Sequence, residues 1–228
     1  MVVNLVRSGR KQPQLFSASA GGKARHPHFL LSLGAAVIGA AKGSVRMRAQ
    51  RFIGAVLLAG VASGSAFAVD GVSIQGGVGG GSSEGSGTEM IRAALQWDWK
   101  QRWFQGKDWH VGGFWNVGVG YWQRDATPGQ NGELYEIGVT PVFRLQGNEL
   151  AGPYVEAGVG AHLLSETSLG DRRFSTSFQF GSHLGIGYRF GARRAFDLSY
   201  SYQHLSNADI KTPNYGIDFH QIRLQCHF

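Results

Sequence analysis

Hydrophobic and polar positions alternate with a period of two along much of this chain. In residues 111–121 the odd positions are mostly bulky and apolar, whereas the even positions are largely glycine. The same period recurs, strongly or weakly, in seven further stretches: 71–79, 90–99, 135–145, 154–163, 178–190, 196–204 and 216–228. Alternation of this kind is typical of β-strands, whose successive side chains point to opposite faces. The pattern predicts an all-β protein of eight antiparallel strands.

The polar face of these strands distinguishes the candidate architectures. It consists mostly of glycine with isolated Glu, Arg, Gln and His, which suits the narrow interior of a small barrel whose apolar face contacts lipid. We therefore predict an eight-stranded antiparallel transmembrane β-barrel, with both termini on the periplasmic side. A secreted β-sandwich is the alternative. Six tryptophans lie near predicted strand ends, where an aromatic girdle would form: Trp97, Trp99, Trp103, Trp109, Trp115 and Trp122.

The region before the first strand reads as an export signal. Residues 47–68 combine a basic start, an apolar stretch and the small-x-small sequence Ala66-Phe67-Ala68, as in a secretory signal peptide. We expect Met47 to be the natural start, so that residues 1–46 are a non-native upstream extension; a long leader is the alternative. The mature barrel domain then comprises residues 69–228.

Charge and cysteine content narrow the function classes. The chain carries a formal charge of +7, but residues 1–68 contain nine Lys and Arg and no acid, which leaves 13 basic against 15 acidic residues afterwards. The mature part therefore lacks the basic surface that nucleic-acid binding requires. The single Cys226 excludes an intramolecular disulfide framework, and the histidines show no metal-ligand spacing, so we expect no metal site.

The last predicted hairpin departs from the pattern, because its lipid-facing positions become polar. Alternation places His204 and Ser206 on the outward face of one strand, and Asp218 and His220 on the outward face of the next. Positions two apart on a strand lie roughly 6.5–7 Å apart, which lets an imidazole reach a serine hydroxyl. A carboxylate from Asp218 would orient His204, as in a Ser-His-acid triad. Polar groups facing lipid are costly unless they serve a function.

The run from His204 to Ala208, followed by Lys211-x-Pro213-Asn214-x-Gly216-Ile217-Asp218, resembles the PagL family of outer-membrane lipid A 3-O-deacylases. The resemblance implies that His204 is the general base, Ser206 the nucleophile and Asp218 the orienting acid. It also implies that Asn214, assisted by Asn207, contributes to the oxyanion hole. The family's type member has Glu as its acid, so the shorter Asp218 raises the question of reach to His204.

The resemblance further implies hydrolysis of the 3-O-linked hydroxyacyl ester of lipid A in the outer leaflet of the bacterial outer membrane, without a cofactor. The alternatives are a phospholipase-type outer-membrane esterase and a non-enzymatic structural or adhesive barrel. Arg172 and Arg173 fall in the third external loop, where they would either be solvated or pair with lipid A phosphates. The oligomeric state stays open, with a homodimer among the options.

Overall fold

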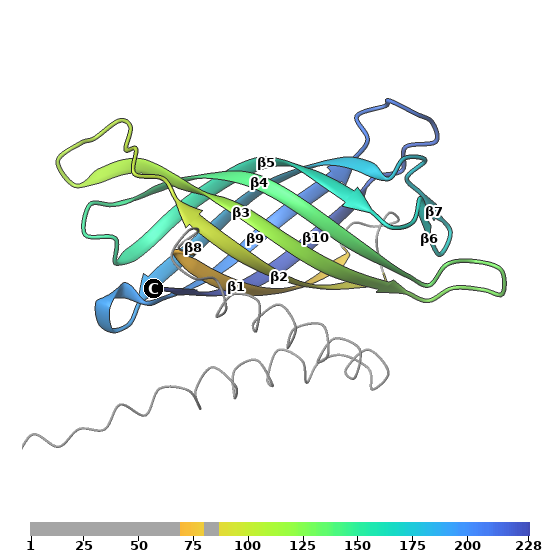
Figure 1. The fold of residues 1–228 in the computed structure, drawn as a ribbon, viewed down its shortest axis with the longest axis horizontal. Coiled ribbons are helices and arrows are strands. Elements are labelled where there is room, and N and C mark those ends of the chain that lie inside the picture. The colour runs from red at the N-terminus through yellow and green to blue at the C-terminus, as the bar shows by residue number, and fades with distance from the viewer. Residues whose placement is uncertain (1–68, 80–86) are drawn as a thin grey trace, which may run out of the picture.

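The computed structural model describes residues 69–79 and 87–228, and it contains a closed antiparallel barrel (Figure 1). Its eight strands, in their order around the barrel, are β1 (Gly71–Gly79), β10 (Ile217–His227), β9 (Phe196–Ser206), β8 (Phe178–Phe190), β5 (Gly152–Leu164), β4 (Glu133–Gly147), β3 (Trp109–Arg124) and β2 (Thr88–Asp98). The predicted fold class is confirmed. The predicted signal peptide, the upstream extension and residues 80–86 of the glycine-rich first loop lie outside the described residues.

Two small elements lie in the connections. The loop between β5 and β8 contains a two-stranded hairpin, β6 (Ser168–Leu169) and β7 (Arg172–Arg173), which the alternation pattern did not predict. A short 3-10 helix, η1 (Ala192–Arg194), forms the turn between β8 and β9. No helix within residues 69–79 and 87–228 has the length and apolar character needed to cross a bilayer.

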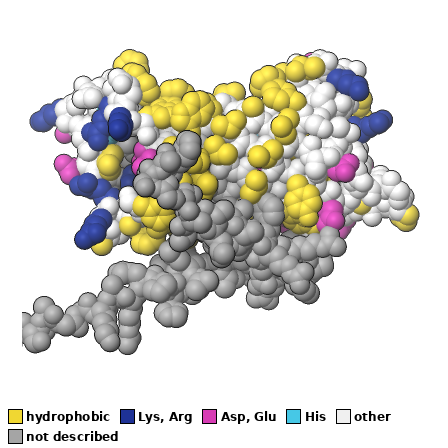
Figure 2. Space-filling model, viewed as in Figure 1, with side chains coloured by type: hydrophobic (Ala, Val, Ile, Leu, Met, Phe, Trp, Pro, Cys, Tyr) yellow, Lys and Arg dark blue, Asp and Glu magenta, His cyan; other side chains and the backbone are white. Residues whose placement is uncertain are grey.

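The two faces of the barrel wall differ as the alternation predicts. Along β8, Leu184, Ile186 and Tyr188 are exposed on the outside, whereas Gln179 is buried in the interior. Hydrophobic side chains cover much of the visible wall, and the charged side chains lie mainly towards the two ends (Figure 2). An apolar exterior around a polar interior is the arrangement of a membrane-spanning barrel, because lipid replaces water on the outside.

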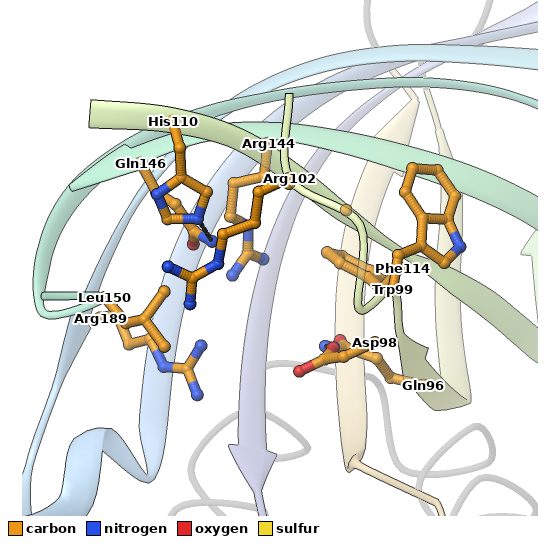
Figure 3. A pocket seen from close by; sticks show the side chains of 12 residues that line it. Gln96, Asp98, Trp99, Arg102, His110, Phe114, Arg144, Gln146, Leu150 and Arg189 are labelled. Atoms are coloured by element: carbon orange, nitrogen blue, oxygen red, sulfur yellow. Dashed lines mark hydrogen bonds between the residues drawn. The ribbon is translucent and has the colours of Figure 1, made fainter. Parts of the chain in front are cut away.

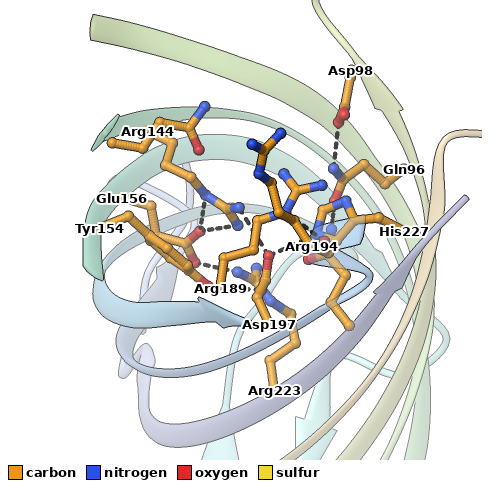
Figure 4. A network of polar contacts seen from close by, with 12 residues as sticks. Gln96, Asp98, Arg144, Tyr154, Glu156, Arg189, Arg194, Asp197, Arg223 and His227 are labelled. Atoms are coloured by element: carbon orange, nitrogen blue, oxygen red, sulfur yellow. Dashed lines mark hydrogen bonds and ion pairs between the residues drawn. The ribbon is translucent and has the colours of Figure 1, made fainter. Parts of the chain in front are cut away.

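A network of buried charged side chains fills the barrel interior at the end where the C-terminus lies (Figure 4). Arg144 lies 2.9 Å from both Glu156 and Asp197, Arg223 lies 2.6 Å from Glu156, and His227 lies 2.7 Å from Asp197. Each carboxylate is shared by two cationic or imidazole groups, so the charges compensate one another within the lumen. These contacts join β4, β5, β9 and β10 across the barrel.

The same end of the lumen contains a small polar cavity of about 90 Å³ (Figure 3). Arg102, Arg144 and Arg189 extend into it, and His110 lies in its wall. Its size suits a few water molecules rather than a continuous channel.

An apolar cluster closes the opposite end of the barrel, which is predicted to face the cell exterior. Its buried members are Met90, Trp122, Leu134, Leu164, Leu169, Phe174, Leu205, Ile217 and Phe219. The Trp122 ring lies 4.9 Å from the ring of Phe219 and 6.2 Å from that of Phe174. The predicted place of Trp122 in an aromatic girdle is therefore wrong. Trp122 shares its parity on β3 with the buried Phe114 and Asn116, so it points inward.

Candidate active site

The hairpin of β9 and β10 brings three of the predicted site residues, His204, Ser206 and Asp218, to one face. In the register of this strand pair His204 lies directly opposite Asp218, and Ser206 follows two positions later on β9. Leu205, between them, points into the interior and is buried. The side chains of His204 and Asp218 are 48% and 25% exposed, so the pair opens onto the outer wall.

The contact between His204 and Asp218 answers the question of reach. The Nδ1 atom of His204 lies 2.6 Å from Oδ1 of Asp218, a hydrogen bond that Nδ1–H donates to the carboxylate. The shorter acid suffices because the two residues are cross-strand partners. With Nδ1 engaged, Nε2 is the ring nitrogen that remains to exchange a proton with a hydroxyl. The Ser206 hydroxyl is half-buried and, within the described part of the chain, forms no hydrogen bond, with His204 or with any other residue.

Gly216, just before β10, packs against both His204 and Ser206. Its φ of +55° is a left-handed conformation that side chains disfavour. A Cβ at this position would lie 2.9 Å from the Leu205 carbonyl oxygen, 3.2 Å from Cε1 of His204 and 3.4 Å from Cβ of Ser206. A glycine is therefore required here by both backbone conformation and space. The sequence motif contains Gly216 but does not indicate this role.

The two asparagines of the closing loop are engaged with the loop itself. Asn207 is fully buried, and its Nδ2 donates to the carbonyls of Phe174 at 2.8 Å and Lys211 at 2.7 Å. The Asn207 backbone N–H donates to Oδ1 of Asn214 at 3.1 Å. The Asn214 Nδ2 donates to the exposed Asp209 carboxylate at 3.1 Å. Asn207 thus fixes the loop, whereas the Asn214 amide makes a contact at the surface.

Two features next to the site were not predicted as parts of it. On the outward face below Asp218, the Tyr200 hydroxyl lies 2.6 Å from Nδ1 of His220, and the two rings stack.

Arg172, expected either to be solvated or to pair with phosphate, is buried, whereas the neighbouring Arg173 is exposed. The expectation that Arg172 is a solvated loop residue is therefore wrong, because the loop folds over the barrel mouth and encloses its side chain.

A shallow apolar groove of about 420 Å³ begins at His204 and follows the outer wall across β9, β8, β5 and β4. Its apolar lining includes Leu184, Val159, Ala157, Pro141 and Phe143. The outer wall of a membrane-spanning barrel contacts lipid acyl chains. An acyl chain can therefore lie in this groove with its polar end next to His204.

The sequence of this chain matches a family profile and two characterised relatives. The family profile described as "Lipid A 3-O-deacylase (PagL)" matches residues 89–227, a range that contains all five site residues. The lipid A deacylase PagL of Bordetella bronchiseptica is 34% identical over 151 residues, covering 63% of this chain and 80% of that protein. The lipid A deacylase PagL of Pseudomonas aeruginosa is 31% identical over 134 residues, covering 58% and 73%.

The fold comparison agrees with the sequence comparison. The crystal structure of the outer membrane enzyme PagL superimposes with a TM-score of 0.61 at 27% sequence identity. It covers 69% of this chain and 99% of the solved chain. The similarity therefore spans the whole barrel of that enzyme.

Proposed function

Because this chain belongs to the PagL family of lipid A 3-O-deacylases, we propose that it hydrolyses the 3-O-linked hydroxyacyl ester of lipid A with Ser206, His204 and Asp218 as its triad. The protein is a β-barrel enzyme of the bacterial outer membrane. Its substrate would be held in the outer leaflet, next to the barrel wall. This location agrees with a site that opens sideways onto lipid.

One observation carries the proposal: the hydrogen bond of 2.6 Å between His204 and Asp218 lies on the lipid-facing wall, with Ser206 on the same face. A buried or luminal pair would be explained by charge compensation alone, as in the ion network of the lumen. An exposed histidine and carboxylate at the edge of an apolar wall have no such explanation. Catalysis by a serine needs this combination of base and orienting acid.

The reaction follows from this arrangement. Oγ of Ser206 forms a bond to the ester carbonyl carbon while Nε2 of His204 accepts the serine proton, and Asp218 stabilises the imidazolium. The imidazolium then gives its proton to the departing sugar oxygen as the ester bond breaks, which leaves an acyl-enzyme. Water, deprotonated by His204, adds to the acyl carbon and releases a 3-hydroxy fatty acid, and Ser206 regains its proton.

The negative charge of the tetrahedral intermediate needs hydrogen-bond donors. Nδ2 of Asn214 is suited to this role, because its partner Asp209 is exposed and an oxyanion can replace it. Asn207 supports the role indirectly, since its backbone N–H holds Oδ1 of Asn214. The acyl chain would occupy the groove that begins at His204 and contains Leu184 and Val159.

Mass spectrometry of lipid A from cells expressing the full-length chain tests the proposal. We expect lipid A to lose one hydroxyacyl chain with the wild-type protein, and to keep it with Ser206→Ala or His204→Ala. A triad variant should lose at least roughly 10³-fold in rate while the barrel still folds. Ser177→Ala is the matched control, because Ser177 is an exposed serine directly before β8, at the same end of the barrel, and does not line the groove.

The competing functions give different spectra. Accumulation of lysophospholipid with unchanged lipid A would indicate a phospholipase-type esterase. Unchanged lipid A and phospholipids would indicate a non-enzymatic barrel. Full activity in Ser206→Ala would reject Ser206 as the nucleophile, and an equal loss in Ser177→Ala would show that the loss does not report on the nucleophile.

A further inference from the structure

The third external loop, residues 165–177, is bonded to the closing loop, residues 207–216, along much of its length. Oγ of Ser175 donates to the Pro213 carbonyl at 2.6 Å, and Nδ2 of Asn207 donates to the Phe174 carbonyl at 2.8 Å. The backbone N–H of Tyr215 donates to the carbonyl of Arg173 at 3.3 Å. The loop that precedes Asp218 is therefore held from the side by a loop far away in sequence.

Arg172 contacts the backbone next to the candidate active site. Its Nη1 donates to the carbonyl oxygens of Tyr215 at 3.1 Å and Gly216 at 2.9 Å. The residue is only 6% exposed, so the guanidinium is held inside the protein, where a charge-assisted hydrogen bond is stronger than in water. A buried cation thus holds two successive carbonyls at the point where the chain enters β10.

The position of those carbonyls matters for His204 and Ser206. Gly216 packs so closely against both residues that even an added Cβ would lie 3.2 Å from His204 and 3.4 Å from Ser206. Two residues later the chain presents Asp218, which bonds to His204. A displacement of the Gly216 backbone would therefore disturb the alignment of base, nucleophile and acid together.

We propose that Arg172 is a positioning residue for the deacylase reaction, which holds the backbone of Tyr215 and Gly216 so that His204, Ser206 and Asp218 stay aligned. The proposal rests on the function proposed above. It differs from a role in binding lipid A phosphates, because Nη1 of Arg172 is hydrogen-bonded to two carbonyls of the protein backbone. The exposed neighbour Arg173 is the better placed of the two to meet a phosphate.

A phosphate-free substrate separates these two roles. We would measure kcat and KM of the purified full-length barrel in detergent with p-nitrophenyl decanoate, and deacylation of purified lipid A in parallel. For Arg172→Met we expect kcat to fall on the order of 100-fold on both substrates with KM for the ester nearly unchanged, as for a misaligned catalytic group. Arg172→Lys, which restores a cationic donor, should recover most of this loss. Arg173→Met, the matched charge control, should behave as wild type on the ester.

Several outcomes would overturn the proposal. Wild-type kcat on the ester in Arg172→Met, with a loss on lipid A alone, would assign Arg172 to phosphate binding. Failure of Arg172→Lys to recover activity in a folded barrel would also count against a positioning role. If Arg172→Met does not fold, as judged by heat-modifiable migration, Ser175→Ala takes its place. This variant removes one bond between the same loops and should lower kcat about 2- to 10-fold. An unchanged kcat in Ser175→Ala would then reject the proposal.

The failure of the proposed function would look different. In that case Ser206→Ala would keep its activity, whatever the result for Arg172. Loss of activity in Ser206→Ala together with full activity in Arg172→Met on both substrates would leave the triad intact and reject the positioning role alone.

Discussion

Asp218 and His204 meet because they are cross-strand partners, so the side chain of the acid can be short. The contact orients an imidazole that is otherwise exposed to lipid and solvent on the outer wall. Without a fixed orientation, such a ring would sample several rotamers and only some would face Ser206. In the proposed triad the carboxylate would supply both alignment and charge stabilisation to the base.

Replacing Asp218 by Asn should separate these contributions from folding. We expect Asp218→Asn to lower kcat roughly 100-fold or more, because the amide cannot stabilise an imidazolium and can favour the wrong tautomer. Asp218→Glu keeps the charge and should lose far less. Kinetics on the p-nitrophenyl ester, with heat-modifiable migration to check folding, measures both. Equal rates for the Asn and Glu variants would argue against a role for the carboxylate charge.

At this scale the sequence predicted orientation well and loop contacts poorly. Alternation alone placed His204, Ser206 and Asp218 outward, because a strand's period leaves little freedom once its neighbours are known. The burial of Arg172 depends on how residues 165–177 fold over the barrel mouth, and no local pattern encodes that path. The role of Gly216 depends on a close approach between side chains and backbone, which arises only when the closing loop folds against β9.

Among the elements, β8 shows why the inward face is rich in glycine. Gly187 lies opposite Tyr154 of β5, and a Cβ on Gly187 would come within 2.3 Å of the Tyr154 ring. The ring therefore occupies the space next to the glycine, and its hydroxyl donates to Oδ1 of Asp197 at 2.7 Å. Glycine on one strand makes room for an aromatic residue on the next. The alternation predicted a glycine-rich lumen, but not which side chain fills each space.

Filling this space should destabilise the barrel. We expect Gly187→Val to lower the free energy of unfolding by about 1–3 kcal/mol, because the added methyl groups displace Tyr154 from Asp197. Ile186→Leu, at the adjacent lipid-facing position, should change it by less than about 1.5 kcal/mol. Urea unfolding in detergent, followed by tryptophan fluorescence, gives both values. A Gly187→Val barrel as stable as wild type would show that Tyr154 can move without loss.

The whole molecule is a barrel with two differently sealed ends. Buried ion pairs connect the strands at the end of the barrel where the C-terminus lies. Packed aromatic and aliphatic side chains close the opposite end of the barrel. The polarity of the interior did appear in the sequence, as isolated charged residues among glycines. The pairing did not, because Arg144, Asp197 and Arg223 come from different strands and meet only when the barrel closes.

Removing the carboxylate shared by two arginines tests the ion network. Glu156 accepts from Arg144 and Arg223, so Glu156→Gln leaves buried positive charge without its partner. We expect a loss of about 3–5 kcal/mol in the free energy of unfolding. Glu149→Gln removes the exposed partner of Arg194 instead and should cost less than about 1 kcal/mol. Similar unfolding curves for the two variants would contradict a stabilising role for the lumen network.

Because the candidate active site lies on the outer wall of the barrel, the proposed reaction takes place in the plane of the bilayer. With His204 as the proposed base, lipid A would reach the site by lateral diffusion within its own leaflet. The governing concentration is then the mole fraction of lipid A around the barrel rather than moles per litre in bulk. Diluting the substrate with inert amphiphile in mixed micelles would therefore slow turnover, even when the total quantity of lipid A in the tube stays the same.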